Sequence, residues 1–549
     1  MSVDFFEGTL KRLQEFSGRS YTGADTTCSP NKLSARARIR ILTVCGLASL
    51  LCYTLLISFA LNVHLKALQA GSSLRSNGLI YDASHTTYAG PLTWPGRWLR
   101  LGSLPRAGQS VFYYSVLVLL IAAYLVAAYI VRKDNRRITT VLIVGGFLLF
   151  ALMFLFIPSF CTRDLFSYAF QGRAMTVYKS NPFLLTPAMQ KADVFRPLID
   201  WQNSASVYGP VFNSLSAIVC FAGRNSIASN VLGFKILATV FFAGSLPLVY
   251  WLTKRISPGR ENFAVLFTAW SPILIPHICG GGHNDSIMIF FVLVGFYLCR
   301  HDHAFWGLVS ITLAALTKAT AALVLLPYLV YMFRSLRGNV LRKMCAAMAV
   351  VVSVTAALYI PFWAGPRMFK AMIDIAKHFS AGSLPTFVRG IIAQMLLATG
   401  VSKHTAGTLA TSVASLTCML VFLTLSLYFL HRVRDFRSMT SSTAAIVLVW
   451  FFTAPYILPW YLSLAITTCV ICGWNANTLG TLMASTLFTA YWLPDTARYH
   501  PRTLTAFNQS PAVLLVSVPF ALAFFVWLSF ATPVAHAFLI RKHLGEKGS

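Results

Sequence analysis

The sequence predicts an all-α protein, a polytopic bundle of about 13–15 transmembrane helices with amphipathic helices in its outer loops. Two observations carry this prediction. The chain is 56% hydrophobic and only 11% charged, whereas a soluble domain is about 25% charged. The apolar residues also form runs of roughly 20 residues, each long enough to cross a bilayer as a helix, and short basic turns separate these runs.

The ends and loops of the chain are predicted from its basic residues. Residues 1–40 are polar and basic, so we expect a cytoplasmic tail and no cleavable leader, and residues 535–549 form a second cytoplasmic tail. Residues 41–534 make up a single transmembrane domain of the plasma membrane. Because basic turns face the cytoplasm, both termini lie inside, and the outer loops fall near 64–110, 159–207 and 364–406.

The predicted spans begin with three clear apolar runs, near 41–63, 111–131 and 139–158. Two shorter segments, 208–222 and 386–400, either both span or are both re-entrant or interfacial helices, and we favour the second interpretation. The remaining spans are expected near 228–252, 262–278, 286–299, 304–317, 320–333, 344–363, 407–430, 441–457, 459–474, 476–493 and 511–533.

Charge narrows the class of partner. The net charge is +29, but the basic residues form no continuous stripe, which argues against nucleic acid and favours membrane lipid headgroups and phosphates. Membrane proteins usually concentrate Lys and Arg in their cytoplasmic loops, but the predicted outer loops of this chain are basic too. A basic outer surface suits an anionic ligand. The 11 cysteines have no framework spacing and are read as small core residues.

The segment FIPSFCTRDLFSYAFQGRAMTVYKSNPF places one of only 16 acidic residues, Asp164, directly after an apolar run. Asp164 and Tyr168 share one face of a predicted short helix that lies on the membrane. Arg163 and Arg173 would keep the carboxylate ionised, as a general base requires. A helix N-cap or a solvated loop acid is the simpler explanation for a lone aspartate.

Two turns that contain proline bracket the rest of this outer loop. In NPF, Pro182 forces Asn181 out of helical geometry, so the helix ends there. In SVYGPVF, the start of a helix near Pro210 accounts for Gly209 and Pro210. The start of a helix gives no reason for a tyrosine at position 208, so Tyr208 is a candidate site residue.

The segment CGGGHNDSIMIFF lies at the predicted outer start of a span. Its three glycines allow a tight backbone turn. His283, Asn284 and Asp285 then form a polar group that could hold sugar hydroxyls, although helix capping by Asn284 or Asp285 explains the pattern equally well. A metal site on His283 and Asp285 lacks a third ligand at recognisable spacing.

Two further polar features lie at predicted outer span ends. Lys318, in LAALTKATAAL, either snorkels to the nearest surface or meets a phosphate, and the sequence favours neither. In APYILPWYL, an aromatic belt at the membrane interface accounts for Trp460 and Tyr461. A stacking wall for a sugar ring or an isoprenoid is the alternative.

The order of these motifs resembles that of the integral-membrane glycosyltransferases of the GT-C type. It is closest to the polyprenol-phosphomannose-dependent α-1,6-mannosyltransferases of actinobacteria, over roughly residues 110–530. The resemblance implies an acidic base in an early outer loop, here Asp164, a lipid-linked sugar phosphate as donor, and inversion at the anomeric carbon. In this chain the acid follows the third span and stands alone, and the N-terminal hundred residues of the chain lie outside the resemblance.

We therefore expect a transferase that moves a hexose, mannose by resemblance, from polyprenyl phosphate to a hydroxyl of an extracytoplasmic glycan or glycolipid. No cofactor is required, because the leaving group is a phosphate monoester and a divalent metal is not obligatory. A transporter or flippase is the alternative, disfavoured because polar residues gather at span ends and not at span centres. The candidates for stabilising the leaving phosphate are Arg163, Arg173, Lys318 and Arg389.

Overall fold

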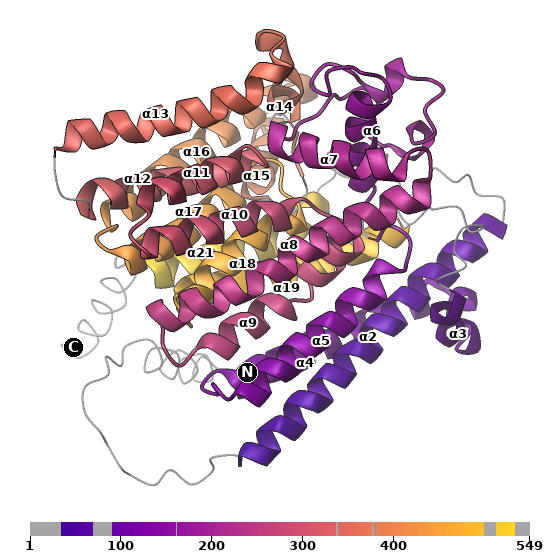
Figure 1. Cartoon of the computed structure of the whole chain (residues 1–549). Helices are drawn as coiled ribbons and strands as arrows, with labels where there is room; N and C mark the ends of the chain where they lie inside the picture. The colour runs from indigo at the N-terminus through magenta and orange to yellow at the C-terminus, as the bar shows by residue number, and fades with distance from the viewer. Residues whose placement is uncertain are drawn as a thin grey trace.

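The structure is a computed structural model that describes residues 34–69, 90–160, 162–335, 339–375, 378–380, 383–498 and 512–532. Within these ranges all regular secondary structure is helical and no strand occurs, which confirms the predicted all-α class (Figure 1). The two predicted cytoplasmic tails lie largely outside the described residues, and so do residues 70–89 of the predicted loop 64–110.

Six helices are long and apolar enough to cross a membrane, by length and composition. The first three coincide with the three clear predicted spans. The six are α2 (Ala35–Gln69), α4 (Arg106–Val131), α5 (Arg137–Leu155), α8 (Ile227–Ile256), α13 (Val340–Tyr359) and α16 (Lys403–His431). Figure 1 shows α2, α4 and α5 next to one another on one side of the bundle and α13 on the opposite side.

Shorter helices fill the interior of the bundle. Every residue of α18 (Leu462–Ile471) and of α9 (Glu261–Ala269) is buried, so other helices cover them on all sides. This burial explains why segments of about ten residues fit within a bundle of much longer helices. The remaining helices of the bundle are α10 (Asp285–Arg300), α11 (Ala304–Ala315), α12 (Ala322–Ser335), α17 (Phe436–Thr453), α19 (Ala476–Arg498) and α21 (Ala512–Ala531).

The predicted outer loops contain short helices of their own. These are α3 (Gly90–Trp98), α6 (Asp164–Thr176), α14 (Lys370–Ile375) and α15 (Leu384–Ala398), and α7 (Pro210–Gly223) follows the loop 159–207 directly. Single 3₁₀ turns complete the connections, at Leu101–Ser103, Pro187–Met189, Arg196–Leu198, Ala319–Ala321, Ile360–Phe362, Pro366–Phe369 and Pro459–Tyr461, and Ile275–Gly280 forms a π-helical turn.

The two segments of ambiguous topology, 208–222 and 386–400, correspond to α7 and α15. With 14 and 15 residues, these helices are about 21–23 Å long. The hydrocarbon core of a bilayer is about 30 Å thick. Their length thus favours the interpretation as re-entrant or interfacial helices.

Helix α6 ends at Thr176, before the Asn-Pro turn, as predicted, but its surroundings differ from the prediction. Nine of its 13 residues are buried, so it is not a helix with one face on the membrane and one in water. Helix α7 covers it at close range, because a Cβ at Gly172 would collide with the carbonyl oxygen of Ser216. Figure 1 shows α6 and α7 together at one end of the bundle.

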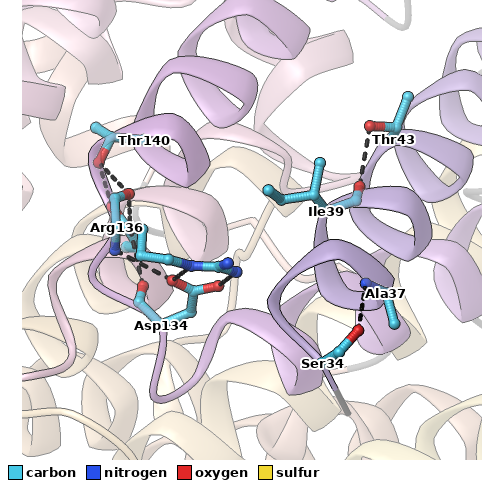
Figure 2. Close-up of polar contacts among 8 residues, drawn as sticks. Ser34, Ala37, Ile39, Thr43, Asp134, Arg136 and Thr140 are labelled. Carbon is cyan, nitrogen blue, oxygen red and sulfur yellow. Dashed lines mark hydrogen bonds and ion pairs between the residues drawn. The ribbon is translucent and has the colours of Figure 1, made fainter.

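The basic turns gather at the other end. The Arg260 guanidinium donates to the carbonyl oxygen of Arg132 at 2.9 Å, which joins the turn after α8 to the turn after α4. In the turn between α4 and α5, Asp134 accepts the backbone N–H of Arg136 at 3.1 Å and its Nε at 2.9 Å (Figure 2). Arg136 thereby lowers the pKa of Asp134 below its usual range. Arg334 likewise donates to the carbonyl oxygen of His431 at 3.2 Å.

Candidate active site

Asp164 is the first residue of α6, and its side chain is half-buried. The residue at the N-cap position is Arg163, and no side chain there caps the helix. The backbone N–H of Asp164 donates instead to Thr162 Oγ1 at 3.1 Å. The carboxylate is therefore not used for N-capping, which removes one of the two simpler explanations for its position.

The glycine run at 280–282 lies against the segment that leads into α6. Phe160 donates its backbone N–H to the Gly280 carbonyl at 3.1 Å. Gly282 has φ +67°, and a Cβ on it would lie 2.9 Å from Leu165. Only glycine combines this left-handed conformation with so close an approach. The run therefore brings the adjacent His283–Asp285 group to the start of α6.

Asp285 and Lys318 form a buried ion pair. Lys318 Nζ lies 2.7 Å from Asp285 Oδ2, and the two side chains are 8% and 0% exposed. Ser463 Oγ of α18 donates to Asp285 Oδ1 at 3.3 Å. One of the two explanations from the sequence was that Lys318 snorkels to a surface, and its burial excludes this explanation. Instead, the pair joins the start of α10 to the end of α11.

The YGP segment packs against the residues that precede Lys318. Gly209 donates its backbone N–H to the Thr317 carbonyl at 3.2 Å. A Cβ at Gly209 would collide with the carbonyl oxygen of Leu316. This contact fixes the neighbouring Tyr208, whose hydroxyl lies 3.5 Å from that of Tyr168. Tyr208 is therefore held in the same region as Lys318.

Aromatic rings pack between these polar groups. Tyr168 OH lies 3.1 Å from His283 Nδ1. The His283 ring stacks on Trp460 with centroids 3.9 Å apart and planes 23° apart. Lys318 Nζ lies 4.5 Å from the centroid of the Tyr461 ring, a cation–π contact. Because Trp460 is buried, it does not belong to an exposed aromatic belt, and its stacking partner in this structure is His283.

The electrostatics of Asp164 depend on burial and on Lys318. Burial raises the pKa of Asp164 to about 7, and the positive charge of Lys318 opposes this rise. The expectation that Arg163 and Arg173 keep Asp164 ionised is wrong. Arg163 Nη1 lies 2.7 Å from Asp200, and Arg173 Nε lies 2.8 Å from the buried Asp193. Arg173 is also nine positions further along α6, about 14 Å by helical rise.

Two predicted substrate-binding residues, Asn181 and Arg389, contact other parts of the protein than the group around Asp164. Asn181 Nδ2 donates to the Phe362 carbonyl at 2.6 Å, and its Oδ1 accepts the Phe183 N–H at 2.9 Å, so both ends of the amide stabilise a turn. Arg389 of α15 stacks over Phe379, 4.9 Å from the ring centroid. These contacts connect Asn181 and Arg389 to the outer loops and not to Asp164.

Several buried polar atoms of the site lack a hydrogen-bond partner. Within the described residues, these are Asn284 Oδ1 and Nδ2, His283 Nε2 and His277 Nδ1. Leaving a buried polar group unsatisfied costs roughly 1–3 kcal/mol, so such groups point to a ligand that satisfies them. Asn284 occupies the N-cap position of α10 but makes no side-chain cap bond, which removes the capping explanation here as well.

Two residues of the site were not predicted. His277 lies six positions before His283 in a π-helical turn, with ring centroids 5.9 Å apart, and such turns are common at functional sites. Ser463 follows the PWY motif by two positions. Within the described residues, no three His, Cys, Asp or Glu side chains are grouped so that they could hold a metal ion.

Comparisons with known proteins show which sequences this chain resembles. Residues 81–335, which contain Asp164, His283, Asp285 and Lys318, match the family model described as Alpha-(1->6)-mannopyranosyltransferase, N-terminal domain. The chain is 25% identical over 385 residues to the Alpha-(1->6)-mannopyranosyltransferase A of Mycobacterium tuberculosis, a match that covers 67% of this chain and 71% of that protein.

Two relatives from Corynebacterium glutamicum are also similar. The Alpha-(1->6)-mannopyranosyltransferase B is 27% identical over 373 residues, which cover 61% of this chain and 59% of that protein. The Alpha-(1->6)-mannopyranosyltransferase A is 28% identical over 181 residues, covering 32% and 36%. The chain is therefore similar to alpha-(1->6)-mannopyranosyltransferases over 67% of its length, and it has several candidate membrane spans.

Proposed function

We propose that this protein transfers mannose from a polyprenyl-phosphate sugar to a hydroxyl group of an extracytoplasmic glycan or glycolipid. The observation that carries the proposal is the joint placement of a half-buried carboxylate, Asp164, and a buried ammonium, Lys318, whose charge acts on that carboxylate. A base for the acceptor and a cation for the leaving group are the two elements that this reaction needs.

Asp164 is the proposed general base. It takes the proton of the acceptor hydroxyl while the oxygen forms a bond to the anomeric carbon and the bond from that carbon to the phosphate oxygen breaks. A base works best when its pKa is near the working pH. The pKa of about 7 suits this role, because the carboxylate is ionised at neutral pH and still basic enough to take a proton.

Lys318 is the proposed cation for the departing polyprenyl phosphate. Asp285 holds it at 2.7 Å, and Tyr461 lies beneath it. An ammonium fixed in advance stabilises negative charge without reorganisation when the phosphate leaves. Arg163 and Arg173, which the sequence also suggested for this role, are paired with Asp200 and Asp193. We assign them to the support of α6.

Asn284 and His283 are the proposed contacts to the sugar hydroxyls. Both are fully buried and carry side-chain atoms without a partner within the described residues. An amide offers a donor and an acceptor together, which matches the dual character of a hydroxyl group. The chemistry calls for no metal, because the phosphate monoester leaves without a nucleoside diphosphate.

The proposed location is the plasma membrane, with the site on the extracytoplasmic side and both termini in the cytoplasm. Support comes from the connected basic turns after α4 and α8 and after α12 and α16, which gather at the end opposite to α6. Basic turns face the cytoplasm in most membrane proteins.

The transport alternative has little support. Lys235, the charged residue nearest a span centre, donates to the carbonyl oxygens of Phe154, Ile157 and Pro158 at 2.6–3.0 Å. These carbonyls lie at the end of α5, where a cation is favourable. Its role is therefore structural, and it provides no pathway for a substrate.

The test uses membranes that contain the full chain, incubated separately with radiolabelled polyprenyl-phosphate mannose and with a nucleotide sugar. We expect incorporation from the lipid-linked donor, and a loss of about 10²- to 10⁴-fold in kcat for Asp164→Asn with little change in donor KM. Asp374→Asn, which alters an exposed ion pair in α14, is the matched control. Incorporation only from the nucleotide sugar would exclude the proposed donor.

A further inference from the structure

A cavity lies away from Asp164, where four helices meet at the end of the bundle that carries the basic turns. It has a volume of about 450 Å³. Helices α16 and α21 end at it, and helices α17 and α19 begin there. Its walls are formed by Phe429, His431, Arg432, Arg434, Ser438, Ser441, Ser442, Asn475, Ala476, Asn477, Phe530 and Ala531.

The polar wall of this cavity is cationic. His431, Arg432 and Arg434 supply the basic groups, and no lining residue is acidic. Within the described residues, the guanidinium of Arg434 makes no ion pair and is exposed. The nearest acid in the sequence, Asp435, does not itself line the cavity; as the N-cap of α17 it accepts the N–H of the lining residue Ser438 at 2.7 Å.

Hydroxyl and amide groups stand beside these cations. Ser438, Ser441 and Asn475 line this wall at the starts of α17 and α19. The Ser438 hydroxyl donates to Asp435 Oδ1 at 2.7 Å and the Asn475 amide donates to the Gly473 carbonyl at 3.1 Å. The guanidinium groups are therefore the main donors of this wall, and guanidinium groups bind phosphate oxygens through charge-assisted hydrogen bonds. The polar half of the cavity is therefore suited to a phosphate.

The apolar part of the lining comes from the ends of helices α16 and α21. Phe429 lies two residues before the end of α16, a candidate membrane span, and Phe530 lies one residue before the end of α21. A free phosphate would use only the polar half of such a site. A ligand with a phosphate joined to an apolar part would use both halves.

We propose that this cavity binds the phosphate headgroup of an anionic membrane lipid, with the lipid's apolar part against Phe429 and Phe530. Basic pockets between membrane helices on the predicted cytoplasmic side are suited to such headgroups. The chain beyond Ala531 is a poor occupant by charge, because its last nine residues contain Arg541, Lys542 and Lys547 against one acid, Glu546.

The experiment measures the thermal unfolding midpoint of the full chain in detergent during titration with dioctanoyl phosphatidylglycerol. A ligand that binds only the folded state raises this midpoint in a concentration-dependent way. We expect Arg434→Gln to need about tenfold more lipid for the same shift, since one charge-assisted contact is lost. The matched control is Arg342→Gln, an exposed arginine in the first turn of α13 that does not line the cavity.

Two further arms identify the ligand. Zwitterionic dioctanoyl phosphatidylcholine should shift the midpoint much less than phosphatidylglycerol, and inorganic phosphate at the same concentration should leave it nearly unchanged. The proposal is overturned if Arg434→Gln and wild type respond equally. It is also overturned if inorganic phosphate reproduces the lipid response, because the cavity would then be a site for a free anion. None of these measurements depends on transferase activity.

Discussion

The pH dependence of the transferase gives the sharpest test of the site. Burial raises the pKa of Asp164 to about 7. A base must be ionised, so kcat/KM should be high above pH 7 and fall below it. With this pKa, about one carboxyl in eleven is ionised at pH 6 and about ten in eleven at pH 8, which predicts a roughly tenfold change in rate between the two.

Lys318 provides the second half of this test. Its positive charge favours the ionised form of Asp164, so Lys318→Met should move the midpoint of the pH profile to higher pH as well as lower the rate. Lost stabilisation of the leaving group would lower the rate without moving the midpoint, so a shifted midpoint reports the effect of the Lys318 charge on the pKa of Asp164. Arg389→Gln, which alters a basic residue stacked on Phe379, should leave the midpoint in place.

The assay is incorporation of labelled mannose from the lipid-linked donor at subsaturating concentration, between pH 5.5 and 8.5. A flat profile across this range would refute the assignment of Asp164 as the base. An unchanged midpoint in Lys318→Met would contradict the electrostatic coupling while leaving the base assignment intact.

Three further predictions concern stability, each measured by unfolding of the purified protein in detergent. Asp285→Asn leaves the Lys318 ammonium buried without its partner and should cost about 3–5 kcal/mol, and the double variant with Lys318→Met should regain most of this loss; additive losses would contradict the pairing. Arg173→Met likewise strands a buried carboxylate and should destabilise by about 3–5 kcal/mol, yet the remaining enzyme should keep the wild-type pH midpoint. Gly209→Ala forces a backbone collision and should destabilise strongly, whereas Gly407→Ala, at an open helical position, should be neutral or stabilise by about 0.5–1 kcal/mol; similar behaviour of the two would refute the close approach.

The sequence was sufficient to predict the long helices and the types of residue that form the site. Long apolar runs give α2, α4 and α5 because their periodicity and length are local properties. The partner of Lys318 was not predictable in this way, since Asp285 lies 33 positions earlier and only the tertiary fold joins them. The sequence therefore left two explanations for this lysine open.

Sequence proximity also misled the assignment of charge partners. Arg163 and Arg173 lie near Asp164 in the chain, but each pairs with an acid from residues 193–200. The burial of α6 was missed for a related reason. Its polar residues indicated a surface helix, and the covering by α7 depends on one small residue, Gly172, whose contact role is not apparent from a single sequence.

The glycines explain why short motifs, individually weak, together define a site. Gly209 allows one backbone to lie against the carbonyl of Leu316, two residues before Lys318, and Gly282 allows another to lie against the start of α6. Each is the point where two distant segments touch, and each immediately adjoins a polar residue of the site, Tyr208 or His283. A side chain at either glycine would separate the segments and with them the base from the ammonium. The glycines are thus positioning residues, and their replacement should disturb the coupling of Asp164 to Lys318 before it disturbs either group alone.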